Sequence, residues 1–288
     1  MPVVVARHDI DAAIAEEHAA RAAAELGDSI ARVARNKPKA LRSVLVYSLM
    51  ETAGRCVADP GAESAETWGP VVSAMQAASA QFALATATEG EVEIRLADQV
   101  FTVSPTGPTY QTDVGAWLRA LYLAMICRER GRIDRLAAVS IDDVLRASGA
   151  RYDEYAYSWV RAWQTYWREE DGLVDSVLNA MRGTDPEALS TADEDVVLHL
   201  LYPPIELFYL LTQRQDDRFN ASLANALELH KRFWGRDDER RGDPDGYIAW
   251  ALLAVACLAR DAGVVVEVES EYLPRHLLEG TWVGEQVT

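Results

Sequence analysis

The sequence predicts an all-α protein built as a multi-helix array. Apolar residues recur at spacings of three and four along most of the chain, which is the period of amphipathic helices, and runs of alanine accompany them. Hydrophobic residues make up 49% of the 288 residues and charged residues 25%, as in ordinary globular domains. A chain of this length and composition can fold on its own around a large core.

The N-terminal third contains three long predicted helices. Asn36-Lys37-Pro38 separates the first helix from the second, because proline lacks the backbone N–H that a helix interior requires. We expect these helices at residues 10–34, 39–58 and 66–86.

A β-hairpin is expected near residues 91–103. Valine, isoleucine and leucine alternate with charged residues over 91–96, as in a strand with one buried face, and a second apolar stretch follows the turn Ala97-Asp98. The run Ser104-Pro105-Thr106-Gly107-Pro108 then forms a loop into the next helix.

The rest of the chain returns to the helical period. Pro203-Pro204 is expected to stop one helix before the next begins. Gly263 is expected to cap the last long helix, ahead of a short strand at residues 264–268 with β-branched composition. The expected helices cover residues 112–130, 141–147, 155–169, 173–181, 193–201, 205–213, 219–233 and 247–261.

We expect a single helical domain over residues 1–288. Helices joined by short turns are compatible with a solenoid-like stack, although no repeat of fixed period stands out. If the domain divides into two lobes, the hairpin and its loop mark the division near residues 88–110.

Three segments carry the excess negative charge of a chain whose net charge is -17. Residues 56–94 and 183–213 each contain six carboxylates and no Lys or Arg, and residues 261–288 contain six carboxylates and one Arg. Acidic surface of this kind repels nucleic acid and attracts basic partners. The alternative interpretation is that these carboxylates serve solubility alone.

The sequence favours a cytoplasmic location. Charged residues begin at Arg7, where a signal peptide has an apolar run, and the most apolar stretch, residues 247–259, is shorter than the ~20 residues that cross a bilayer. We therefore expect no membrane association. Cys56, Cys127 and Cys257 lie far apart without CxxC spacing, which predicts buried free thiols and neither a disulfide framework nor a zinc site.

Signatures of catalysis are sparse. The motifs GxSxG, HExxH, GxxxxGK[ST] and GxGxxG are absent. Asp195 and His199, four residues apart, would hold a metal only if Glu228 or His230 joined them, and a lone pair of this kind is more often a surface contact. Residues 216–220 (DDRFN) resemble the DDxxD of terpenoid synthases but end in Asn and suit a helix start. We predict no enzyme, no metal and no cofactor.

The aromatic residues are more suggestive of binding. Tyr155, Trp159, Trp163 and Trp167 stand four residues apart on one helix, which places them along one stripe. Core packing is the plainest interpretation, whereas a ring at the edge of the stripe would anchor a partner, because Trp and Tyr are frequent at interface hot spots. Trp234 is the other aromatic residue expected to be partly exposed. With nearby carboxylates, the candidate partner-binding residues are Trp159, Trp163, Trp167, Asp193, Glu194, Asp195, Trp234, Glu267, Glu269 and Glu271.

Nine stretches, spread in order over nearly the whole chain, resemble the immunity protein 49 family of bacterial polymorphic toxin systems. Residues 247–250 and 264–266 depart from the family pattern, which bears on the identity of the partner more than on the fold. The matching stretches are residues 66–68 (ETW), 74–76 (AMQ), 83–93 (ALATATEGEVE), 106–108 (TGP), 152–155 (YDEY), 164–167 (QTYW), 201–205 (LYPPI), 226–231 (ALELHK) and 268–278 (VESEYLPRHLL).

The resemblance implies an antitoxin that is encoded beside a secreted toxin and protects the producing cell and its kin. It implies no catalytic residues. Many such toxins are basic nucleases, and an acidic protein can occupy the groove meant for phosphate. We therefore expect stoichiometric binding of a cognate toxin domain, and no binding of nucleic acid. The alternatives are a helical scaffold or regulatory module that binds a cellular protein or peptide, and a helical enzyme with a metal in its core.

Overall fold

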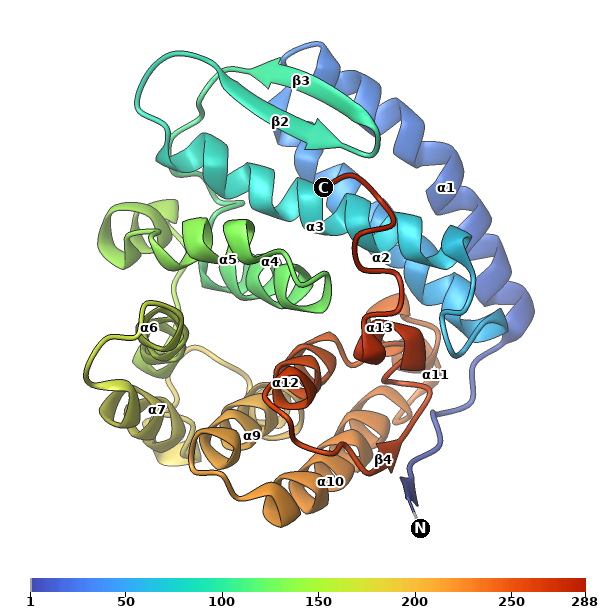
Figure 1. Ribbon diagram of the computed structural model, residues 1–288, viewed down its shortest axis with the longest axis vertical. Helices are drawn as coiled ribbons and strands as arrows, with labels where there is room; N and C mark the ends of the chain where they lie inside the picture. Colours follow the sequence, from blue (N-terminus) through green and yellow to red (C-terminus); the bar gives the residue numbers. More distant parts are fainter. Residues whose placement is uncertain (1) are drawn as a thin grey trace.

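The computed structural model describes residues 2–288 and confirms the all-α class. Figure 1 shows the helices following one another round the molecule, with α12 inside the curve and the C-terminal segment returning across α3. The array therefore closes on itself instead of extending as an open stack.

Three long helices form the N-terminal part, and each begins and ends within two residues of its expected position. Asp11 caps the first helix by accepting hydrogen bonds from the backbone N–H groups of Ala13 and Ile14. The first two helices pack closely at Gly54, where a Cβ atom would stand 2.5 Å from the Ala15 carbonyl oxygen. The helices are α1 (Ala12–Ala34), α2 (Leu41–Ala58) and α3 (Ala65–Thr86).

The predicted hairpin is confirmed as β2 (Val92–Leu96) and β3 (Gln99–Val103), paired antiparallel with Leu96 opposite Gln99. Ala97 turns the chain with a φ of 53°. The buried Gln76 side chain of α3 holds this turn, because it accepts from the Ala97 N–H at 2.7 Å and donates to the Ala97 carbonyl at 3.3 Å.

The helix expected over residues 112–130 is present but ends four residues early, and the helix that follows it was not predicted. The structure has α4 (Val114–Ile126) and α5 (Arg130–Ala137), separated at Arg128, whose φ is 56°. The Arg128 guanidinium donates to the carbonyl oxygens of Leu277 and Leu278 at 2.8 and 2.7 Å. The helix is therefore interrupted where this side chain fastens the C-terminal segment.

The next helices differ from expectation mainly in type. Residues 141–147, expected as an α-helix, form a π-helical turn (Ile141–Leu145) and a 3-10 turn (Arg146–Ser148) instead. Two α-helices then follow as expected, α6 (Glu154–Trp167) and α7 (Leu173–Arg182).

Pro203-Pro204 does not separate two helices, so that prediction is wrong. The helical run continues from α8 (Glu194–Val196) through a π-helical turn (Val197–Leu201) into α9 (Tyr202–Thr212). Both prolines fall in the first turn of α9, and the widened π-helical turn before them accommodates the lost backbone N–H groups.

The remaining helices complete the curve, and the C-terminal strand is shorter than expected. Val268–Glu269 (β4) pairs in parallel with Val3–Val4 (β1), while residues 264–267 run without regular structure. Gly263 has a φ of 91° and follows the last long helix as the expected cap. The helices are α10 (Asp216–Trp234), α11 (Asp238–Arg241), α12 (Trp250–Asp261) and α13 (Arg275–Glu279).

One continuous hydrophobic core runs from Val5 to Leu278. The last residues join it by returning to the N-terminal part, since the Trp282 indole donates to the Ala62 carbonyl at 3.2 Å and Gln76 donates to the Val287 carbonyl at 3.1 Å. All three cysteines are buried and free, as predicted. The division into lobes near residues 88–110 stays a prediction.

Among residues 2–288, one helical run, Glu194–Thr212, is long and apolar enough to cross a membrane by length and composition. Of its apolar stretch, 44% is buried inside the protein, and the core helices of soluble proteins can pass the same test.

Candidate functional site

The aromatic stripe of α6 divides into two buried rings and one at the edge. Trp159 and Trp163 have exposed fractions of 3% and 0% and pack on the ring of Phe208. The Trp159 indole N–H also donates to the buried Tyr122 hydroxyl at 3.0 Å. These two tryptophans therefore have almost no surface to offer a partner. Trp167 is half-buried, with the Arg130 guanidinium 4.9 Å from its ring centroid, and stays a candidate.

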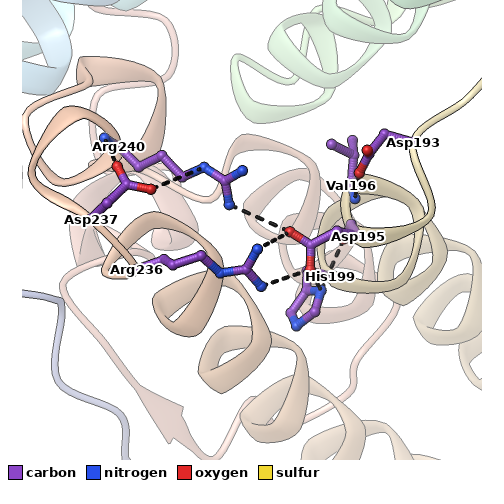
Figure 2. A network of polar contacts seen from close by, with 7 residues as sticks. All are labelled: Asp193, Asp195, Val196, His199, Arg236, Asp237 and Arg240. Atoms are coloured by element: carbon purple, nitrogen blue, oxygen red, sulfur yellow. Dashed lines mark hydrogen bonds and ion pairs between the residues drawn. The ribbon is translucent and has the colours of Figure 1, made fainter.

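Asp195 lies at the centre of an ion-pair network that joins α8 to the residues following α10 (Figure 2). Arg236 donates to both of its oxygens at 2.7 and 2.8 Å, and Arg240 approaches at 3.4 Å. The Arg236 hydrogen bonds lower the pKa of Asp195. Asp195 is thus committed to holding two segments together, whereas the neighbouring Glu194 is exposed.

Asp193 has a local structural role as well. It caps α8 by accepting from the Val196 backbone N–H at 3.1 Å, and its side chain remains exposed (Figure 2).

The residues considered for a metal do not converge. Within residues 2–288, no three His, Cys, Asp or Glu side chains form a metal-binding group. His199 pairs with Asp195, but the buried His230 ring faces the Gly246 carbonyl at 3.0 Å. Burial lowers the pKa of His230 to about 4, so this ring is neutral at pH 7.

The segment Asp216–Asn220 starts a helix, as its sequence suggested. Asp216 and Asp217 lie in the first turn of α10, where acidic residues are favourable. The Asn220 side chain donates to the Val265 carbonyl and accepts from the Glu267 N–H. It therefore secures the chain ahead of β4.

The remaining predicted site residues are Trp234, at the end of α10, and the carboxylates around β4, a strand that contacts α10. Trp234 is half-buried against Gly246 and Phe233. Glu267, Glu269 and Glu271 are all exposed around β4, and only Glu271 approaches a cation, with its oxygen 3.8 Å from Arg7.

A groove that the sequence did not predict offers accessible aromatic surface. It consists of two hollows, of about 400 and 270 Å³, that share Gly115, Arg119 and Tyr152. We call this feature the α4 groove. Its walls come from α2, the loop before α4, α4, α6, α9 and α12. The larger hollow includes Arg42, Val46 and Tyr110, and the smaller includes Trp159, Leu201 and Trp250.

The α4 groove combines an apolar floor with a mixed polar rim. Tyr110 is 56% exposed, Leu201 is 39% exposed, and Trp159 forms part of the floor. At the rim, Arg119 and Asp245 approach within 3.9 Å. Exposed Tyr and Arg next to apolar surface are typical of interface hot spots. No periodic pattern reveals the groove, because its residues come from segments far apart in the sequence.

Comparison with known families identifies the chain over most of its length. A family model described as Immunity protein 49 matches residues 59–277, from the end of α2 to α13. Neither the curated proteins nor the solved structures that were compared contain a match. The matched region includes every predicted site residue and most of the α4 groove. The chain belongs to the immunity protein 49 family.

Proposed function

We propose that this protein is an immunity protein that binds a cognate secreted toxin one to one, in the cytoplasm of the producing cell, and blocks it without any catalytic step. The family match over residues 59–277 is the observation that carries the proposal. Neither nucleic acid nor a membrane has a part in it.

The α4 groove is the contact surface that we propose for the centre of the complex. An apolar or aromatic side chain of the toxin would enter the 270 Å³ hollow and lose its contact with water against Trp159 and Leu201. Tyr110 and Arg119 would close around it from the rim. Trp159 then contributes by shaping the floor rather than by direct exposure.

The acidic segments support a toxin with a basic surface, such as a nuclease. Glu89, Glu91 and Glu93, at the hairpin, have no cation within ion-pair distance among residues 2–288. In Figure 1 the hairpin and β4 lie at opposite ends of the molecule, so their carboxylates form separate patches. Such patches would raise the rate of encounter with a cationic partner at low salt.

The first test is calorimetry of this protein with the C-terminal domain of a toxin encoded beside it, at two salt concentrations. We expect a tight 1:1 complex whose association weakens as salt rises. No binding at either concentration would contradict the immunity function and favour a scaffold that binds a cellular protein.

A matched pair of variants tests the α4 groove. Leu198 and Leu201 lie one turn apart on the same helical run with exposed fractions of 38% and 39%, but only Leu201 lines the groove. We expect Leu201→Glu to weaken toxin binding at least about tenfold, because it places a charge in an apolar contact. Leu198→Glu should bind like the wild type. Equal binding by both variants would exclude the groove as the contact surface.

A further inference from the structure

One hollow of this acidic protein is lined mainly by basic side chains. It measures about 840 Å³ and lies between the N-terminal segment, the end of α10 and α11. Five basic side chains line it, against the carboxylates of Asp9 and Glu228. We call it the cationic pocket; its basic residues are Arg7, Lys231, Arg232, Arg236 and Arg241.

Three of these five cations have a carboxylate within ion-pair distance and two do not. Arg236 is held by Asp195, and Arg241 donates to Asp238 at 2.8 Å. Within residues 2–288, Lys231 and Arg232 have neither an ion pair nor a side-chain hydrogen bond. A pair of free cations at the end of a helix is favourable toward the helix dipole, but it also leaves two charges available to a ligand.

Arg7 supplies the independent sign that an anion belongs here. Its side chain is only 6% exposed, yet its contacts are one hydrogen bond to the Cys56 carbonyl at 3.1 Å and a loose approach to Glu271 at 3.8 Å. A guanidinium has five N–H donors, and a buried charge is costly unless it is paired. The Glu271 side chain is itself 46% exposed.

The shape of the cationic pocket favours a protein segment over a compact phosphate. Phosphate sites commonly present backbone N–H groups at a helix N-terminus. Here the carbonyl end of α10 faces the hollow, at Lys231, Arg232 and Gly235, so this helix presents no free backbone N–H groups to a phosphate. The hollow is also wide open to solvent, so separate cations on long side chains are presented to separate carboxylates.

We propose that the cationic pocket binds an acidic segment of the toxin, whose Asp or Glu carboxylates pair with Lys231 and Arg232, while the nearly buried Arg7 adds its positive charge from within the wall. This inference rests on the proposed function for the identity of the partner. A positive site within an acidic molecule fixes the orientation of the complex, because a toxin that is basic everywhere would be repelled there.

The test compares two double variants that remove the same charge. Lys231→Ala/Arg232→Ala removes the two cations of the cationic pocket that have no carboxylate partner, and Arg182→Ala/Arg218→Ala removes two exposed cations that do not line it. Calorimetry would measure the binding of each to the toxin domain, to a hexaglutamate peptide and to pyrophosphate. We expect the pocket variant to bind both toxin and peptide at least about tenfold more weakly than the wild type, while the control stays within about twofold.

The outcomes separate this inference from the immunity function. If the wild type and the control bind hexaglutamate and the pocket variant does not, the acidic-segment site is supported. This holds even if the toxin does not bind and the immunity function is disproved. Pyrophosphate that binds more tightly than hexaglutamate would make this a small-anion site and overturn the proposal. Equal binding of toxin and peptide by both double variants would overturn it as well.

Discussion

Gly246 lies directly against the indole of Trp234, so that a Cβ atom on Gly246 would stand 2.5 Å from Cδ2 and 2.6 Å from Cγ. The Gly246 carbonyl oxygen also lies 3.0 Å from the ring nitrogen Nε2 of His230, which is one helical turn before Trp234 in α10. The ring of Trp234 is thus fitted to the short turn Pro244–Gly246, which gives this residue a structural role whatever its part in binding.

Gly246→Ala should lower the free energy of unfolding by about 1–3 kcal/mol, because the new methyl group overlaps a ring that cannot withdraw without moving α10. Urea denaturation measures the change. Gly27→Ala is the control: Gly27 lies inside α1 with nothing within 4 Å of the added Cβ. That variant should be more stable than the wild type by about 0.5–1 kcal/mol. A Gly246→Ala protein as stable as the wild type would show that the turn adapts freely.

His230 should make stability depend on pH between about 6.5 and 4. Burial lowers its folded pKa to about 4, below the ordinary histidine value of 6.5. In that interval His230 is protonated in the unfolded chain but not in the folded chain. The free energy of unfolding therefore falls as pH falls, by up to about 3 kcal/mol. Denaturation at pH 7.5 and pH 5 should show this loss, and His230→Gln should reduce it. The same slope in both proteins would contradict the assignment to His230.

The hydrogen bond between Trp159 and Tyr122 should appear as a coupling energy. Trp159→Phe and Tyr122→Phe each leave a buried polar group without its partner, which costs about 1–3 kcal/mol, with an added cavity cost for the tryptophan. The double variant should therefore cost less than the two single variants together, by about 1 kcal/mol. A double-mutant cycle by urea denaturation measures this, and additive losses would mean that the bond contributes nothing.

Asp153 should stabilise the fold at neutral pH and lose this effect in acid. Its carboxylate accepts from the backbone N–H groups of Ser190, Thr191 and Ala192. Burial opposes ionisation, but these bonds and the Ser190 hydroxyl prevail and lower the pKa to about 2. Since the folded pKa lies below the ordinary aspartate value of 3.8, the stabilisation is full above pH 3.8 and disappears as pH falls through 2.

Asp153→Asn should therefore cost about 2 kcal/mol at pH 7, with a difference from the wild type that shrinks below pH 4. Asp185→Asn is the matched control, because Asp185 caps a short turn with one backbone contact and is exposed. Asp185→Asn should lower the free energy of unfolding by no more than about half as much as Asp153→Asn. A difference that does not change with pH would point to packing rather than charge.

Local signals carried most of the fold prediction. The division between α1 and α2 follows from the break at Asn36-Lys37-Pro38, and the hairpin follows from alternation around Ala97-Asp98. The break at Arg128 was missed because its cause lies about 150 residues away, in the carbonyls of Leu277 and Leu278. Chain distance hides such contacts from any local pattern.

The candidate sites were harder to foresee for a similar reason. A spacing of four places Trp159, Trp163 and Trp167 on one stripe but does not say which end faces solvent. Only the packing of Phe208 against the first two decides it. The carboxylate of Asp195 likewise appeared free in the sequence, whereas Arg236 engages it from 41 residues away.

The return of the C-terminal segment to α3 and the pairing of β1 with β4 tie both ends of the chain to segments far away in the sequence. An open array can fray from its ends one unit at a time, whereas fraying here also breaks contacts with the opposite end of the sequence. Unfolding of this protein is thus expected to be cooperative over the whole chain, so that cutting the last few residues loosens the helices at both the start and the finish of the sequence.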